Sequence, residues 1–103
     1  MREIRVLAAA RAEAERATVA RERTTWLGEE FEAAVDAALD LLMLDPIPSL
    51  PVRGRVATRG VWRLILKRFP FDAIFVENSG FIFVIAFANH ARRPGFWLRR
   101  LRT

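Results

Sequence analysis

The sequence has 103 residues, of which 52% are hydrophobic and 28% charged, and it contains no cysteine. This length suits one hydrophobic core, so we expect a single domain over residues 1–103. The lack of cysteine excludes disulfides and thiolate metal sites. Charges interrupt the N-terminus, and the longest uncharged apolar run, Phe81 to Ala88, is too short to span a bilayer. The sequence therefore predicts a cytoplasmic protein without a membrane segment.

The two halves of the chain carry opposite charge. Residues 1–51 hold six arginines and ten acidic residues, a net charge of −4, whereas residues 52–103 hold eleven Lys or Arg and two acidic residues, a net charge of +9. A concentrated positive field attracts polyanions and acidic protein segments. The second half is expected to bind one of these, the other interpretation being that its arginines only keep the surface soluble.

The first half predicts a short strand and two helices. Arg2 to Leu7 alternates apolar and charged residues, which indicates a half-buried strand or an early start of the first helix. Ala8 to about Arg23 is rich in Ala, Glu and Arg, which favour a helix with a solvated face. Thr24 and Thr25 can cap a second helix, which Asp45-Pro46 ends. That helix has an apolar stripe at spacings of three and four: Leu27, Phe31, Ala34, Val35, Ala38, Leu39 and Leu42.

The second half predicts strands. Three prolines in residues 46–51 indicate an extended connector, and residues 52–60 indicate a basic loop or frayed edge strand. Val61 to Phe69 reads as a strand with Arg63, Ile65 and Lys67 on one cationic face. Pro70 separates this strand from the next, since proline cannot donate to a central ladder.

A β-hairpin is predicted over Phe71 to His90. Strand-forming residues lead to Glu77-Asn78-Ser79-Gly80, which has turn chemistry, and Phe81 to Ala88 is apolar at every position. A fully apolar strand needs cover on both faces, so this strand should be internal. Strict alternation would turn its larger residues toward the helices: Phe81, Phe83, Ile85 and Phe87. The predicted fold class is α+β, with an N-terminal helical hairpin packed on a three- to four-stranded antiparallel sheet.

Several strings, in this order and spacing, resemble the RelE/ParE family of toxins from bacterial type II toxin–antitoxin systems. The strings span nearly the whole chain: Ala9-Ala10-Arg11-Ala12-Glu13, Leu27-Gly28-Glu29-Glu30-Phe31, Asp45-Pro46, Lys67-Arg68-Phe69-Pro70-Phe71 with Ile74-Phe75, and Phe87 to Trp97 with its His, Arg-Arg and Pro-Gly. The resemblance implies a helical hairpin on an antiparallel sheet. It also implies a cognate antitoxin as partner, in a toxin–antitoxin hetero-oligomer, and no cofactor.

The family contains two different activities, ribosome-dependent mRNA cleavage and inhibition of DNA gyrase, and the fold alone does not choose between them. A third alternative is a nontoxic binding module that has kept the same fold. Many relatives carry tyrosines where this chain has Phe71, Val76 and Phe96, and the sequence contains no tyrosine at all. A mechanism in which a phenol exchanges a proton is therefore excluded. The sequence leans toward mRNA as the target, because eleven cations suit an RNA backbone.

The candidate residues for RNA cleavage follow from what that reaction needs. Attack of a 2′-hydroxyl on the adjacent phosphate requires a base, an acid and cations around the transition state. His90 is the only histidine, and Lys67 is the other candidate for proton transfer. Arginines cannot exchange protons but bind phosphate, and an aromatic ring can stack on a base. The predicted catalytic residues are His90, Lys67 and Arg68, and the predicted substrate-binding residues are Arg53, Arg55, Arg92, Arg93, Phe96 and Trp97.

Each candidate also has a purely structural interpretation. His90 can simply end a strand and bond to the backbone, and the arginines can form a solvated basic face. Trp97 suits a packing anchor for the C-terminal segment better than a stacking platform. No metal-ligand cluster, glycine-rich phosphate loop or catalytic triad is visible in the sequence.

Overall fold

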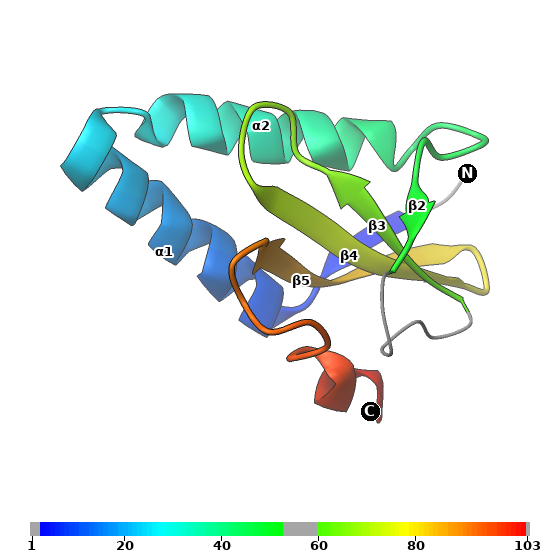
Figure 1. Ribbon diagram of the computed structural model, residues 1–103. Coiled ribbons are helices and arrows are strands. Elements are labelled where there is room, and N and C mark those ends of the chain that lie inside the picture. Colours follow the sequence, from blue (N-terminus) through cyan, green and yellow to red (C-terminus); the bar gives the residue numbers. More distant parts are fainter. Residues whose placement is uncertain (1–2, 53–59, 103) are drawn as a thin grey trace.

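A computed structural model describes residues 3–52 and 60–102 as an α+β fold (Figure 1). Two helices precede most of the sheet, as the sequence predicts. The elements, in chain order, are β1 (Glu3–Val6), α1 (Ala8–Thr25), α2 (Gly28–Leu41), β2 (Leu50–Pro51), β3 (Val61–Ile65), β4 (Phe71–Asn78), β5 (Phe81–Asn89) and a short 3₁₀ helix, η2 (Leu98–Arg102).

The sheet has five strands in the order β1-β5-β4-β3-β2. Strand β5 is internal, as predicted, because β1 and β4 flank it on either side. The sheet is wider than the three or four strands expected, because a two-residue strand ends the proline-rich connector and pairs with β3. It is also not purely antiparallel, since β1 pairs with β5 in parallel through the register Glu3↔Phe81 to Val6↔Val84. The long connection that parallel pairing requires is provided here by the helices and three intervening strands.

The turn between β4 and β5 has the predicted chemistry. Ser79 and Gly80 both have positive φ, 51° and 82°, which suits a two-residue hairpin turn whose twist matches the strands. A side chain is rarely tolerated in this backbone region, and Gly80 has none.

The junction of the helical hairpin differs from the sequence prediction. The prediction that Thr24 and Thr25 cap the second helix is wrong: α1 runs through both residues, and their hydroxyls donate to the carbonyls of Ala20 and Arg21, each at 2.8 Å. Helix α1 ends at Thr25, and the next residue, Trp26, has a left-handed backbone with φ 61°. A threonine hydroxyl can bond to the carbonyl four residues back as well as cap the next helix, so composition alone does not locate the boundary.

The alternation of side chains along β5 is broken by an irregularity in its pairing with β4. Ile74 pairs with Ala86 but Phe75 pairs with Val84, so Ile85 is an extra residue on β5. Such a bulge reverses the faces to which the following residues point. The expectation that Phe81, Phe83, Ile85 and Phe87 all meet the helices is therefore wrong. Only Phe87 of this set belongs to the buried cluster beneath the helices, together with Ile82 and Val84 of the other set.

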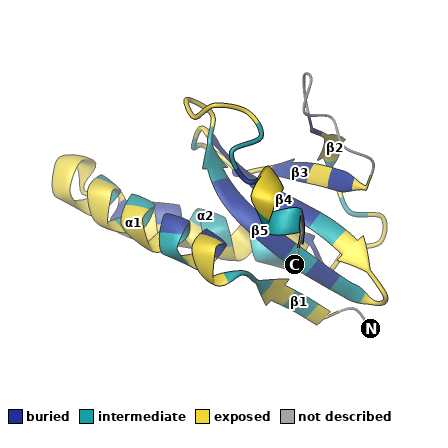
Figure 2. Cartoon of the chain, turned by 90° about the horizontal axis from the view of Figure 1, so that it is seen from below, coloured by how far each residue is buried: buried dark blue, intermediate teal, exposed yellow. Residues whose placement is uncertain are grey.

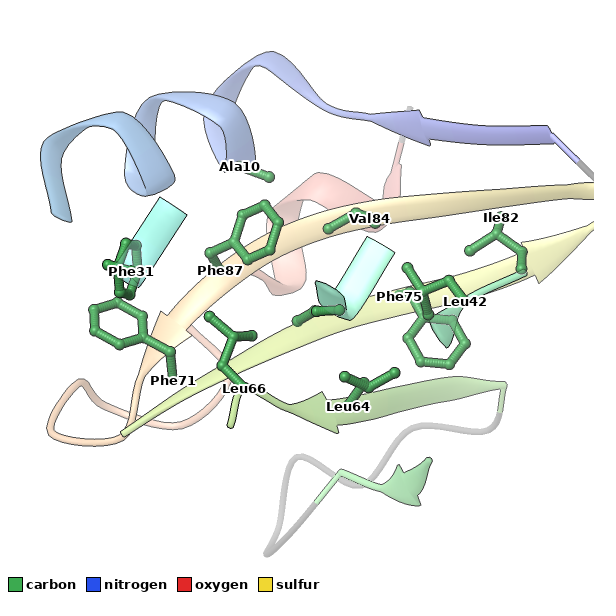
Figure 3. Close-up of a cluster of buried hydrophobic side chains, with 12 residues drawn as sticks. Ala10, Phe31, Leu42, Leu64, Leu66, Phe71, Phe75, Ile82, Val84 and Phe87 are labelled. Atoms are coloured by element: carbon green, nitrogen blue, oxygen red, sulfur yellow. The ribbon is translucent and has the colours of Figure 1, made fainter. Parts of the chain in front are cut away.

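Two buried clusters cover the two faces of the sheet. Between the helices and the sheet, Phe31, Leu42, Leu66 and Phe75 are among the largest fully buried side chains (Figure 3). The opposite face is covered by the C-terminal segment, and Trp97 is buried there against strand residues (Figure 2). An apolar internal strand thus receives the cover on both faces that its composition requires.

Candidate functional site

A shallow pocket of about 240 Å³ opens where β5 ends and the C-terminal segment crosses the sheet. Residues of β3, β4 and the end of β5 line it together with the segment from His90 to Trp97, which we call its rim. Its lining residues are Val52, Arg63, Asp72, Ile74, Ala88, Asn89, His90, Arg92, Arg93, Pro94, Gly95, Phe96 and Trp97. Five of the residues predicted for the site lie together here: His90, Arg92, Arg93, Phe96 and Trp97.

Asp72 joins a histidine and an arginine in this pocket. Its Oδ1 lies 2.8 Å from Nε2 of His90, and its Oδ2 lies 3.5 Å from a terminal nitrogen of Arg63. The Asp72 side chain is 11% exposed and that of His90 is 42% exposed. When Nε2 carries the hydrogen that the carboxylate accepts, Nδ1 is the nitrogen that can take up a proton. The pocket thus holds an oriented, accessible imidazole beside cationic groups.

The position of His90 follows from the ladder. Its backbone N–H donates to the carbonyl of Pro70 at 2.8 Å, directly after Asn89 pairs with Phe71. Asp72 is the next residue along β4, so its carboxylate lies next to the end of β5. The backbone N–H of His90 makes the hydrogen bond that the structural interpretation expects of a histidine at a strand end. Within the described residues, its imidazole ring does not bond to the backbone but to Asp72.

The predicted cationic, solvated face of the strand that contains Arg63 is wrong. The residue is 7% exposed rather than solvated, and its Nε donates to the carbonyl of Pro51 at 3.3 Å. Ile65, placed on the same face by alternation, is instead 44% exposed. A buried guanidinium needs an anionic partner, and Asp72 on the neighbouring strand provides it.

The rim arginines are in different environments. Arg92 forms an ion pair at 3.3 Å with Glu13 of α1, and its guanidinium carbon lies 3.5 Å from the ring centroid of Phe96. Arg93 is exposed, and it takes part in none of the ion pairs formed among the described residues. Trp97 is 3% exposed, so it serves as the packing anchor that the sequence suggested.

The remaining predicted residues lie elsewhere. Lys67 and Arg68 form the exposed turn after β3, where Arg68 has φ 75°. This turn is at the same end of the sheet as His90, but neither of its cations lines the pocket. Arg53 and Arg55 lie outside the described residues. A role for these four side chains stays a prediction.

The sequence analysis did not include three residues that lie in the pocket or support it: Asp72, Arg63 and Glu13. Asp72 and Arg63 were discernible, because an acid inside an apolar strand and an arginine in the strand before it are natural partners across a ladder. Glu13 gave no such signal, since it lies among the charges of α1 yet is 6% exposed. Its partners come from the other end of the chain.

No group of three or more His, Cys, Asp or Glu side chains within residues 3–52 and 60–102 is arranged to hold a metal ion. Likewise, none of the helices in this part of the chain is long and apolar enough to cross a membrane.

Comparison with known proteins places the fold. No family model matches the sequence, and no curated protein is significantly similar to it. Among solved structures, the chain is similar to one from a chromosomal ParDE TA system of P. aeruginosa, with a TM-score of 0.70 and 16% identity over 86% of this chain and 96% of that chain. The chain has the RelE/ParE fold. At this identity the RelE/ParE likeness is one of architecture, and activity has to be argued from the pocket.

Proposed function

We propose that this chain is the toxin of a type II toxin–antitoxin pair, held inactive by an acidic antitoxin. Two observations support the proposal: a chain from a ParDE TA system shares the fold over nearly its whole length, and the pocket gathers Arg63, Arg92 and Arg93 in one place. An acidic, partly disordered segment wrapped over this pocket would offset its ordering entropy by charge pairing and apolar burial.

Bacterial growth assays test whether the chain is a toxin. Expression of the chain alone is expected to stop growth, and co-expression of a small neighbouring reading frame is expected to restore it. Soluble, folded protein that leaves growth unaffected would contradict the assignment as a toxin.

We further propose that the toxic activity is ribosome-dependent cleavage of mRNA. The observation that carries it is the 2.8 Å contact between His90 and Asp72 in a pocket lined by arginines. In the proposed step, the 2′-oxygen of a nucleotide bonds to the adjacent phosphorus while the bond to the 5′-oxygen breaks. Nδ1 of His90 accepts the 2′-hydroxyl proton, and the departing 5′-oxygen takes a proton from water. Arg93 compensates the charge on the phosphate.

The enzyme is tested by mapping messenger ends in cells that express the toxin. Translation-dependent cuts are expected in the wild type and are expected to be lost in His90→Ala. Lys67→Ala is the matched arm, because Lys67 is the other sequence candidate for proton transfer and lies outside the pocket. Cuts that persist in His90→Ala but vanish in Lys67→Ala would move the proton transfer to the turn after β3.

The second candidate is inhibition of DNA gyrase without catalysis, and the exposed arginines of the C-terminal segment, Arg93 and Arg99, favour it, because exposed cations suit a contact surface. In that case the basic segment from Arg92 to Arg102 is a contact surface, and replacing its exposed arginines (Arg93→Ser with Arg99→Ser) should reduce toxicity more than His90→Ala does, while Trp97 and Arg100 stay in place to hold the fold. Purified protein is to be assayed for loss of supercoiling. Intact transcripts together with blocked supercoiling would reject the nuclease and support the inhibitor.

A further inference from the structure

Arg92 and Phe96 form a stacked pair at the rim of the pocket. The guanidinium carbon lies 3.5 Å from the centroid of the phenyl ring, so the cation covers one face of that ring. The Arg100 guanidinium lies 5.4 Å from the same ring. One face of the partly buried Phe96 ring is therefore covered by a cation, and Trp97 is buried, which leaves neither aromatic ring freely available to a ligand.

The Arg92 guanidinium is fixed at its edge as well as on one face. A terminal nitrogen donates to Oε2 of Glu13 at 3.3 Å, and Glu13 is itself held by two hydrogen bonds from Arg100. The Glu13 side chain is 5% exposed, whereas that of Arg92 is 50% exposed. Because one face of the guanidinium rests on the ring and one edge on Glu13, the exposed half of the Arg92 side chain is expected to include the opposite face of the guanidinium.

We propose that this open face of Arg92 is the stacking platform for an unpaired nucleobase, in place of Phe96 or Trp97. The inference rests on the proposed function, since it takes the pocket to bind single-stranded nucleic acid. A guanidinium plane stacks on bases as aromatic rings do, and it also attracts the neighbouring phosphate. With Arg93 exposed one residue along, the backbone has a cation of its own, so Arg92 contributes the base contact and Arg93 the phosphate contact.

The chemistry of the platform favours a base over other flat ligands. The carboxylates of an acidic peptide would bond to the edge of a guanidinium, and at Arg92 Glu13 already occupies part of that edge, so such a peptide gains nothing from the flat face. A base requires the flat face and loses its stacking on a lysine. The site should therefore prefer a strand with bases over a strand of equal charge without bases, and this preference can be measured.

The experiment compares two single-stranded hexadeoxynucleotides, one of adenines and one with the same phosphates but stable abasic sugars, by fluorescence anisotropy on the full chain at low salt. Deoxy sugars prevent cleavage by 2′-oxygen attack. Wild-type protein is expected to bind the adenine strand roughly 5- to 150-fold more tightly, the range for one stacked base. A strand of purine bases without exocyclic groups should keep that preference, because stacking does not need hydrogen bonds from the base.

Arg92→Lys is expected to keep affinity for the abasic strand and to lose the preference for bases. Phe96→Leu, which removes the ring behind the guanidinium, should reduce the preference as well. Arg99→Lys is the matched control, an exposed arginine on η2 outside the pocket, and it should retain the preference. Thermal unfolding of each variant checks that it is folded.

A wild-type protein that binds both strands equally, or that binds neither, overturns the inference, and so does a preference that survives in Arg92→Lys. Growth arrest is recorded separately. A base preference that depends on Arg92 in a chain that does not arrest growth would reject the toxin and uphold the platform. Growth arrest without a base preference would support the toxin and reject the stacking platform.

Discussion

Glu13 and Arg100 lie 87 positions apart and join the two ends of the chain by two hydrogen bonds of 2.9 and 3.1 Å. Each also bonds to the edge of β5: Oε1 of Glu13 accepts the N–H of Phe87 at 3.1 Å, and Arg100 donates to the carbonyl of Ile85 at 2.8 Å. Pairing of β1 with β5 ends at Val84. The ion pair therefore satisfies backbone groups for which β1 is too short.

Replacing Glu13 with alanine is expected to lower the free energy of unfolding by about 3–5 kcal/mol, because it removes the carboxylate that balances the charge of a partly buried guanidinium and leaves the backbone N–H of Phe87 without its acceptor. Glu13→Gln should cost less, since its amide oxygen can still accept from Phe87. Denaturant unfolding measures both. Glu15→Gln, an exposed acid on the same helix, is the control and should change stability by less than about 0.5 kcal/mol. Equal losses in Glu13→Ala and Glu15→Gln would contradict this role of the ion pair.

The bulge in β5 predicts unequal effects at two phenylalanines of the same strand. Phe87 is 3% exposed in the cluster beneath the helices, so Phe87→Ala should destabilise the fold by about 3–5 kcal/mol. Phe83 is half-buried and does not belong to the cluster beneath the helices. The centroid of its ring lies 5.8 Å from that of Phe81. Phe83→Ala is expected to cost less than half as much. Comparable denaturation midpoints for the two variants would show that strict alternation holds after all.

Asp72→Asn tests whether the carboxylate orients His90 for the proposed cleavage. An asparagine keeps the shape of the side chain but loses its charge, so it no longer stabilises the imidazolium that forms when Nδ1 takes up a proton. Its NH2 group can also donate to Nε2 and fix the other tautomer of the ring. Messenger cleavage is expected to fall roughly 10²-fold or more, the range for loss of general base catalysis. Asp40→Asn on the exposed face of α2 is the control. Full cleavage by a folded Asp72→Asn protein would remove Asp72 from the site.

Trp26 is 82% exposed and adopts a left-handed backbone at the end of α1. That conformation costs a residue with a side chain roughly 1–2 kcal/mol, and glycine avoids the cost although it gains more entropy when unfolded. Trp26→Gly should therefore raise stability by about 0.5–1 kcal/mol, seen as a melting temperature several degrees higher. Trp26→Ala should give no such gain, because alanine has the same steric conflict. A gain in both variants would locate the effect in the indole ring instead of the backbone.

Much of the fold was predictable because it depends on neighbours in sequence. The apolar stripe that includes Phe31 and Leu42 identified α2, the Asn78-Ser79-Gly80 chemistry identified the hairpin turn, and the apolar run of β5 required an internal strand. Each rests on a period or a backbone preference that a few residues express by themselves. The gathering of His90, Arg92 and Arg93 was predictable for the same reason, since they are consecutive or nearly so.

Only the tertiary structure decided the relations between residues on different elements of the chain. The bulge at Ile85 depends on the register with β4, and the parallel pairing of β1 depends on where the helices return the chain. Arg63 and Glu13 look solvated in sequence because a charge is normally exposed. Burial became favourable once Asp72 compensated Arg63 from the neighbouring strand and Arg100 compensated Glu13 from the other end of the chain. Local periodicity therefore determined the elements of this protein, whereas charge pairing in the folded chain decided which of its charges are buried and which stay exposed.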